Sequence, residues 1–275
     1  MNVLSFVKMQ GSGNDFVLIE AKSAFRVSPG FVRNICDRKF GIGADGVLVI
    51  SSSRKADRRM RIFNADGSEA EMCGNGARCS VLWTAAAIGR GRRSVTLETN
   101  AGLVRGEVTG NLVRLKMTDP EDIRLDIHVA VSGKDYEADY VNTGVPHAVI
   151  EVNALDDVPV RDIGRQIRHH KIFSPAGTNV DFIHRQADGM VRIRTYERGV
   201  EDETLACGTG SVASAIISVI NHEGSGTQAK LTHHVSVKTK SGEVLSVDFK
   251  MSKKKVYDVW LEGQAGIVFE GKYFL

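Results

Sequence analysis

Alternation of apolar and polar side chains predicts β-strands in several short segments of this 275-residue chain. The alternation is clear over residues 112–117, 191–196 and 235–239, and a period of two residues places one face of a strand in a core. Shorter apolar runs that also fit strands cover residues 16–19, 47–50, 60–63, 95–98 and 244–249. Many of these segments are joined by turns of Gly, Asn or Asp, so we expect mostly antiparallel sheets.

Two long apolar segments, residues 77–88 and 211–220, have the length and composition of helices. Nearly every position in both is uncharged, with Arg78 as the exception, and a helix that is apolar all round lies inside a protein. The β-branched residues within 216–220 would also suit a strand, so the second segment has two interpretations. We expect strands around one central helix in each half of the chain.

Two shorter helices are expected at the periphery. Ser28 followed by Pro29 is typical of an N-cap and a first helical residue, which predicts a helix over residues 29–36. Residues 162–169 form the other. The pairs His169-His170 and His233-His234 are expected as surface pairs rather than as ligands, because adjacent residues rarely point the same way.

The motif Glu-x-x-x-Cys-Gly-x-Gly occurs twice, at residues 69–76 and 203–210, directly before the two apolar segments. The similarity continues upstream, where residues 13–20 resemble 144–151 at nearly the same offset. Arg-x-x-Asn and Arg-x-x-Glu segments also precede the two cysteines at similar distances. Chance similarity between glycine-rich turns is the alternative, but three matches in one order predict two similar domains facing each other.

Composition is that of an ordinary globular protein, with 42% hydrophobic and 25% charged residues and a net charge of +3. Disordered and collagen-like classes are excluded, and neither nucleic acid nor a membrane is an expected partner. The basic segments at residues 90–93 and 253–255 fit solvated turns. The start of the chain lacks a secretory pattern, and the uncharged stretch 205–221 suits a core helix, so we expect a cytoplasmic protein.

The four cysteines are expected as reduced thiols, because a disulfide scaffold does not suit this size. No Cys-x₂₋₄-Cys pair exists, so no metal site is expected. Cys36 fits a buried apolar thiol. Cys79 lies six residues after Cys73 in the same helix and therefore points away from it, which indicates helix packing.

A cysteine followed by Gly-x-Gly at a helix start has a definite chemistry. The first N–H groups of a helix have no internal partner and create positive potential, so an anion binds there and a thiol ionises more easily. A single copy fits an inert thiol in a tight turn. Two copies could meet at one ligand, with its carboxylate between both helix starts and Cys73 and Cys207 on opposite faces of its Cα. One thiolate would remove a proton while one thiol returns another. No Lys motif announces pyridoxal phosphate, and no cofactor is expected.

These motifs identify a resemblance to the diaminopimelate epimerase family, whose members interconvert LL- and meso-diaminopimelate without a cofactor in lysine and cell-wall synthesis. The resemblance runs nearly end to end. It rests on residues 11–16, 40–45, 63–76, 144–147, 177–179, 196–199 and 206–210. It implies an α/β (α+β) fold of two pseudo-symmetric domains, each a central helix wrapped by antiparallel strands. The domains would span 1–118, with 265–275 returning to it, and 119–264. A homodimer is also implied.

The resemblance also implies roles for particular residues. Cys73 and Cys207 match the catalytic thiols, and His147 and Glu197 match a pair that orients the substrate amine and tunes the thiols. The positions matching the groups that hold the reacting carboxylate are Gly74, Asn75, Gly208 and Thr209. The positions matching side chains that bind the amino and distal carboxylate ends are Asn14, Asn64, Asn179 and Arg198, alongside Glu197.

The chain departs from the family pattern at two positions. Many members carry Gln where this chain has Gly46, and Asn where it has Val145. Two polar contacts are thereby missing from the expected pocket. This leaves the chemistry at Cα intact but leaves open which side chain the substrate carries. A two-thiol racemase of another amino acid, such as histidine, is the nearest alternative. A redox or binding protein that uses Cys73 and Cys207 as a switchable pair is the alternative from another class.

Overall fold

The computed structural model describes residues 3–21, 26–89, 93–223, 231–252 and 255–275. The chain divides into two compact units, which we call the first unit (Met1–Lys116 with Glu262–Leu275) and the second unit (Met117–Leu261). The sequence-based boundaries lie two to three residues further along the chain. Most of the two basic segments expected as turns, residues 90–92 and 253–254, lies outside the described residues.

The first unit is a single run of hydrogen-bonded strands. Its elements are β1 (Val3–Gly11), β2 (Asn14–Glu20), α1 (Pro29–Cys36), β3 (Gly46–Ser51), β4 (Arg58–Asn64), β5 (Glu69–Ala70), α2 (Gly74–Ile88), β6 (Ser94–Thr99), β7 (Gly102–Thr109), β8 (Leu112–Lys116) and β18 (Gly266–Phe274). The strands follow one another as β18, β1, β2, β3, β4, β6, β7 and β8, with β5 added to β4. The pairs β2–β3 and β4–β6 are parallel and the others are antiparallel.

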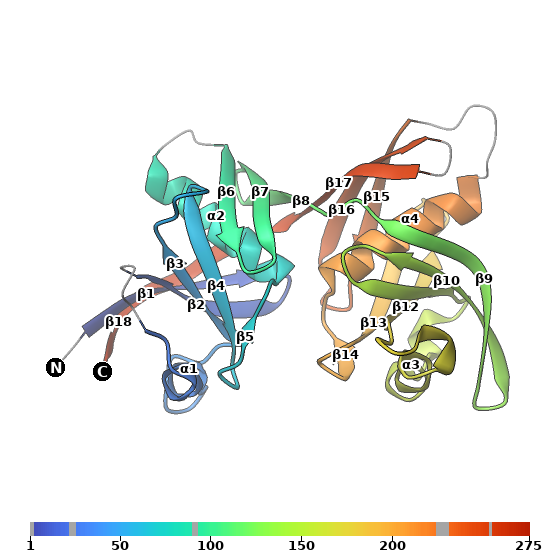
Figure 1. Cartoon of the computed structure of the whole chain (residues 1–275), viewed down its shortest axis with the longest axis horizontal. Coiled ribbons are helices and arrows are strands. Elements are labelled where there is room, and N and C mark those ends of the chain that lie inside the picture. Colours follow the sequence, from blue (N-terminus) through green and yellow to red (C-terminus); the bar gives the residue numbers. More distant parts are fainter. Residues whose placement is uncertain (1–2, 22–25, 90–92, 224–230, 253–254) are drawn as a thin grey trace. The chain divides into compact units, whose positions relative to one another are not determined.

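Helix α2 is enclosed by these strands. It contacts β1 to β4 and β6 to β8, and Figure 1 shows it running between them. Ala77 and Val81 are fully buried along it. A Cβ atom added to Gly106 of β7 would lie 2.7 Å from a methyl carbon of Val81, so this glycine lets strand and helix approach closely. The predicted buried central helix is confirmed.

Helix α1 covers the outer side of the same strands. Ser28 caps it, because its hydroxyl oxygen accepts a hydrogen bond from the N–H of Phe31 at 3.2 Å. Val32, Ile35 and Cys36 are buried and pack with side chains of β2 and β3 in one apolar cluster. The bounds predicted for this helix from Ser28-Pro29 are confirmed.

The second unit repeats this plan. Its elements are β9 (Glu121–Val131), β10 (Lys134–Asn142), β11 (Pro146–Glu151), η1 (Leu155–Asp157), α3 (Val160–Arg168), η2 (Lys171–Phe173), β12 (Asn179–Arg185), β13 (Val191–Glu197), β14 (Asp202–Thr204), α4 (Gly208–Glu223), β15 (Thr232–Lys238), β16 (Val244–Ser252) and most of β17 (Lys255–Gln264). Strands β10 to β16 pair as β1 to β7 do, including parallel β11–β12 and β13–β15.

The edge strand completes the correspondence. β9 pairs antiparallel with β10, and β18, from the end of the chain, pairs antiparallel with β1. The predicted pseudo-symmetric α/β fold with mostly antiparallel strands is therefore confirmed. α4 contacts β10 to β13, β15 and β16, with Val212, Ile216 and Val219 buried, so the helical interpretation of the segment 211–220 is the right one.

One surface prediction is wrong. His233 is 4% exposed and its ring stacks on Phe249 with 5.1 Å between ring centroids. Residues alternate between the two faces of a strand, so β15 buries His233 together with Val235 and Val237 while His234 faces outward. In the described part of the chain, no helix is long and apolar enough to cross a membrane.

Candidate active site

Cys73 lies directly before α2 in the first unit. Its backbone is extended, with φ −145° and ψ 122°, and it occupies the N-cap position of the helix. The residue is partly exposed. A Cβ atom added to Gly74 would meet no heavy atom within 4 Å, so the start of α2 borders open space. First-turn N–H groups that face such a space can bind an anion.

Two of the predicted binding residues meet at this helix start. The amide of Asn75 donates a hydrogen bond to the side-chain oxygen of Asn14 at 2.6 Å. Asn14 in turn donates to Asp45 at 3.1 Å, and the guanidinium of Arg78 donates to the side-chain oxygen of Asn75 at 2.9 Å. The start of β2 and the first turn of α2 are thereby fixed to one another.

A charged cluster holds the segment that carries Asn14. Burial opposes ionisation of the neighbouring Asp15, but Arg38 and Lys8 outweigh it and hold the pKa of this carboxyl well below its ordinary value. Arg38 makes two hydrogen bonds to Asp15, at 2.7 and 3.1 Å, and one to Asp45 at 2.8 Å. Lys8 lies 2.7 Å from Asp15. Asp15 is therefore ionised at neutral pH.

Asn64 ends β4, and its amide donates to the hydroxyl of Ser68 at 3.0 Å. It pairs across the sheet with Gly46 of β3. A Cβ atom at Gly46 would lie 2.6 Å from the carbonyl oxygen of Phe63. Glycine at position 46, where many family members carry Gln, thus fits the backbone found here. A larger residue would require the backbone of β3 or β4 to shift.

Cys207 lies directly before α4 in the second unit and is 7% exposed. The N–H of Gly210 donates to its sulfur at 3.4 Å, and the hydroxyl oxygen of Thr209 lies 3.4 Å from the sulfur. Thr143 donates a hydrogen bond to the carbonyl oxygen of Thr209 at 3.2 Å, which ties the helix start to the turn before β11.

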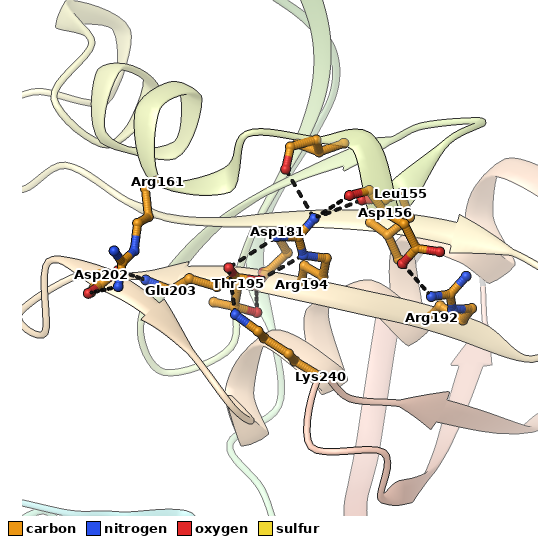
Figure 2. Close-up of polar contacts among 11 residues, drawn as sticks. Leu155, Asp156, Arg161, Asp181, Arg192, Arg194, Thr195, Asp202, Glu203 and Lys240 are labelled. Carbon is orange, nitrogen blue, oxygen red and sulfur yellow. Dashed lines mark hydrogen bonds and ion pairs between the residues drawn. The ribbon is translucent and has the colours of Figure 1, made fainter.

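Strands β11, β12 and β13 place polar side chains on one face beneath this helix start. His147 pairs with Asn179, and Asp181 pairs with Thr195, so these four side chains share a face. Nδ1 of His147 lies 2.7 Å from Asp181, and both side chains are fully buried. Thr195 donates to the other oxygen of Asp181 at 2.7 Å, a contact visible in Figure 2.

Asn179 ties three segments together. Its amide donates to the carbonyl oxygen of Pro146 at 2.9 Å, and its oxygen accepts from the N–H of Arg198 at 2.8 Å. The guanidinium of Arg198 donates to the carbonyl oxygen of Ala176 at 3.3 Å. The side chain of Asn179, predicted to bind substrate, thus holds the backbone at Arg198 in place.

Burial and negative charge keep the second unit's thiol protonated. Burial raises the pKa of the Cys207 thiol well above its ordinary value, and the charges of Glu197 and Asp181 raise it further, against the hydrogen bonds from Thr209 and Gly210. Burial also raises the pKa of Glu197 above its ordinary value. The easier ionisation expected of a thiol at a helix start is therefore outweighed at Cys207.

The sequence did not single out Asp181 and Thr195. The sequence feature that could have pointed to Asp181 is its position as an acid inside an apolar strand, between Val180 and Phe182. The other cysteines lie as predicted: Cys79 is fully buried, and burial raises the pKa of the Cys36 thiol to about 11. The described residues contain no group of three or more His, Cys, Asp or Glu side chains that could hold a metal ion.

Two units of one plan, each with strands around an enclosed helix, form a two-domain fold that is also found in other solved structures. A phenazine biosynthesis protein of the PhzF family from Bacillus anthracis shares it, with 16% identity, a TM-score of 0.75 and both chains covered in full. A hydroxyproline epimerase from Agrobacterium vitis also shares it, with 17% identity and a TM-score of 0.67 over 98% of this chain and 92% of that chain.

Sequence comparison then gives the family. The model of the family "Diaminopimelate epimerase" matches residues 6–128 and 139–262. A diaminopimelate epimerase of Aquifex aeolicus (strain VF5) is 41% identical over 284 aligned residues, which cover 98% of this chain and 97% of the relative. The chain belongs to the diaminopimelate epimerase family and is an isomerase of the epimerase kind.

Proposed function

We propose that this enzyme interconverts LL- and meso-diaminopimelate by proton transfer at Cα between two thiols, without a cofactor. The observation that carries the proposal is the repeat itself, in which Cys73 and Cys207 stand at the same place, directly before an enclosed helix, in both units. A pair of equivalent acid–base groups is what inversion of one carbon requires. Membership of the family supports diaminopimelate as the substrate.

The reacting carboxylate binds between the two helix starts in this proposal. Gly74 and Asn75 contribute N–H groups from α2, and Gly208 and Thr209 contribute them from α4. Loss of the Cα proton places negative charge on that carboxylate, so donors fixed around it stabilise the transition state more than the ground state. The open space beside Gly74 is consistent with a ligand at this position.

Proton balance follows from one thiolate and one thiol. The thiolate takes the Cα proton from one face, and the thiol gives its proton to the opposite face, so the two sulfurs exchange protonation states in each turnover. Cys207 holds its proton firmly, which suits the acid in one direction, with Cys73 as the base. In the reverse direction Cys73 begins as the thiol and Cys207 as the thiolate.

The remaining binding residues follow from their chemistry. Arg198 can hold the distal carboxylate in a bidentate fashion. Amide groups that can donate to a carboxylate or accept from an ammonium group are those of Asn14, Asn64 and Asn179. His147 and Glu197 receive the α-ammonium group and tune the thiols. We further propose a cytoplasmic homodimer that serves lysine and peptidoglycan-precursor synthesis.

Incubation with LL-diaminopimelate in deuterium oxide tests the substrate and the reaction together. Deuterium should enter Cα as the meso form appears, because the proton returned comes from a thiol that exchanges with solvent. A racemase of another amino acid is the second candidate, favoured by the polar groups missing at Gly46 and Val145. Label in histidine but none in diaminopimelate would refute the substrate. No exchange in either, with reversible disulfide formation, would favour a redox protein.

Replacement of either proposed catalytic thiol should stop inversion. Cys73→Ser and Cys207→Ser each leave one functional acid–base group, so turnover should fall by at least about 100-fold. The matched control is Cys79→Ala, which alters a buried cysteine in the same helix that Cys73 precedes and should cost about 1 kcal/mol of stability with unchanged turnover. Normal turnover in either serine variant would contradict the two-thiol mechanism.

A further inference from the structure

The two units differ in the side chains that lie beneath the helix following each cysteine. Strand register aligns β2, β3 and β4 with β11, β12 and β13. In the first unit the side chains at three aligned positions are apolar, and in the second they are polar. The aligned pairs are Phe16 and His147, Leu48 and Asp181, and Ile62 and Thr195.

The last glycine of each Cys-Gly-x-Gly motif lies directly against side chains at these aligned positions. A Cβ atom at Gly76 would lie 2.9 Å from a methyl carbon of Leu48 and 3.0 Å from one of Ile62. A Cβ atom at Gly210 would lie 2.6 Å from a carboxylate oxygen of Asp181. The same repeated glycine therefore makes room for a hydrocarbon in one unit and for a carboxylate in the other.

Burial of the polar side chains at these positions of the second unit costs free energy. His147 and Asp181 are both fully buried, and a buried polar pair is often no better for stability than well-packed apolar side chains of similar volume. The first unit demonstrates that apolar side chains fill the same backbone positions. The polar set in the second unit thus calls for a reason other than stability.

The hydrogen bonds define which nitrogen of His147 carries a proton. An ionised carboxylate only accepts, so with Asp181 at 2.7 Å the Nδ1 atom is the donor. Thr195 donates to the second carboxylate oxygen at 2.7 Å and thereby fixes the orientation of the acid. Nε2 of His147 is buried and has no hydrogen-bond partner among the described residues.

We propose that Asp181, held by Thr195, is a positioning residue that keeps His147 protonated at Nδ1 and reserves the lone pair of Nε2 for a donor on the bound substrate. This inference rests on the proposed function for the identity of that donor, the α-ammonium group. Asp181 acts through His147 and does not itself contact the substrate. As a second effect, Asp181 opposes ionisation of Cys207, because its carboxylate lies directly against Gly210, whose N–H donates to the sulfur of Cys207 at 3.4 Å.

Nitrogen NMR of the full-length protein labelled with ¹⁵N-histidine tests the first part without substrate. At a pH where the ring is neutral, His147 should be the Nδ1–H tautomer, with the signal assigned from His147→Gln. In Asp181→Asn the amide can donate to Nδ1 while Thr195 donates to its oxygen, so the Nε2–H tautomer should dominate. The same tautomer in both proteins would overturn the proposal.

Alkylation of the thiols over a range of pH, followed by mass spectrometry, tests the second part. The charged groups that act on Cys207 are Glu197 and Asp181, and Asp181 in turn contacts His147. Removal of one negative charge lowers the pKa of the thiol, so the alkylation midpoint of Cys207 should move to lower pH in Asp181→Asn. The midpoint of Cys73 should not move. An unchanged Cys207 midpoint would overturn this effect.

Turnover and a milder variant complete the test. Asp181→Asn should lower turnover by about 100-fold, because the lone pair at Nε2 is lost. Thr195→Val retains the acid but removes the hydroxyl that orients it, so it should shift the tautomer and the turnover in the same direction by less. Neither the NMR nor the alkylation uses a substrate, so both stand if diaminopimelate proves to be the wrong one. A changed tautomer with normal turnover would refute a role for Asp181 in the reaction.

Discussion

At the scale of single residues, Arg78 illustrates how one buried charge organises the first unit. The residue interrupts an otherwise uncharged helix and is fully buried. Its guanidinium donates to Ser12, to Asn75 and to the carbonyl oxygen of Gln264. These partners belong to the turn between β1 and β2, the first turn of α2 and the end of β17. Arg78 therefore fixes the proposed binding residue Asn75 to two chain segments that are remote in sequence.

A prediction at the same scale concerns Gly46. Gly46→Ala should lower the free energy of unfolding by about 1–3 kcal/mol, because the new Cβ atom would lie 2.6 Å from the carbonyl oxygen of Phe63 and force β3 and β4 apart. Urea denaturation measures the loss. The control is Gly30→Ala in α1, where the added methyl meets nothing within 4 Å and stability should not fall. Equal stability of the two variants would refute the steric argument.

At the scale of elements, an Arg–Glu pair anchors each strand turn that leads to a cysteine. Arg61 of β4 makes two hydrogen bonds to Glu69 of β5, at 2.8 and 2.6 Å. Arg194 of β13 makes two to Glu203 of β14, at 2.7 and 3.1 Å, as Figure 2 shows. The arginines and glutamates that the repeated sequence patterns share thus form the same contact in both units.

The pair in the second unit is the more buried and the more connected. Arg194 also donates to the carbonyl oxygens of Leu155, Asp156 and Val158. Lys240, from the turn between β15 and β16, lies 2.7 Å from Glu203, whose side chain is 7% exposed. Burial opposes ionisation of Glu203, but its hydrogen bonds to Arg194 and Lys240 lower its pKa below the ordinary value.

This lowered pKa predicts a dependence of stability on pH. Because the pKa of Glu203 is lower in the folded than in the unfolded protein, its stabilisation is full above the unfolded value of about 4.5 and is lost as pH falls through the folded value. Glu203→Gln should cost about 2 kcal/mol at pH 7 and progressively less below pH 4.5. Thermal unfolding at a series of pH values measures this.

Glu69→Gln is the matched control, since Glu69 occupies the equivalent position but its side chain is 30% exposed. Its loss at pH 7 should be smaller, because solvent screens the charge. An equal and pH-independent loss in the two variants would contradict the electrostatic explanation for Glu203.

At the scale of the whole molecule, the proposed mechanism requires the thiols of two separate units to reach one substrate. If they do, a mild oxidant should join Cys73 and Cys207 as a disulfide and abolish turnover, and a reductant should restore it. Peptide mapping under non-reducing conditions identifies the bond. Saturating substrate should protect against the oxidant. A disulfide between any other pair, or full activity with this bond formed, would contradict a shared site.

Much of this fold follows from local sequence. The helix over residues 29–36, both enclosed helices and the strands with alternating side chains were predictable, because burial on one face leaves a periodic pattern in the chain. The duplicated Cys-Gly-x-Gly motif likewise predicted two similar units. Strands such as β9, where most side chains from Glu121 to Val131 are exposed, carry no such period and were not predicted.

Only the tertiary structure decided what lies beneath each thiol. The sequence by itself determined where the cysteines stand relative to their helices, because capping and glycine chemistry act over a few residues. The contact of Asp181 with His147 and Thr195 depends on the register of three strands, two of them joined in parallel by a long connection. Contacts of that kind leave no local pattern. His233 was misplaced for a different reason: the predicted strand began at residue 235, whereas β15 begins at Thr232, so the alternation that buries Val235 was not extended to His233.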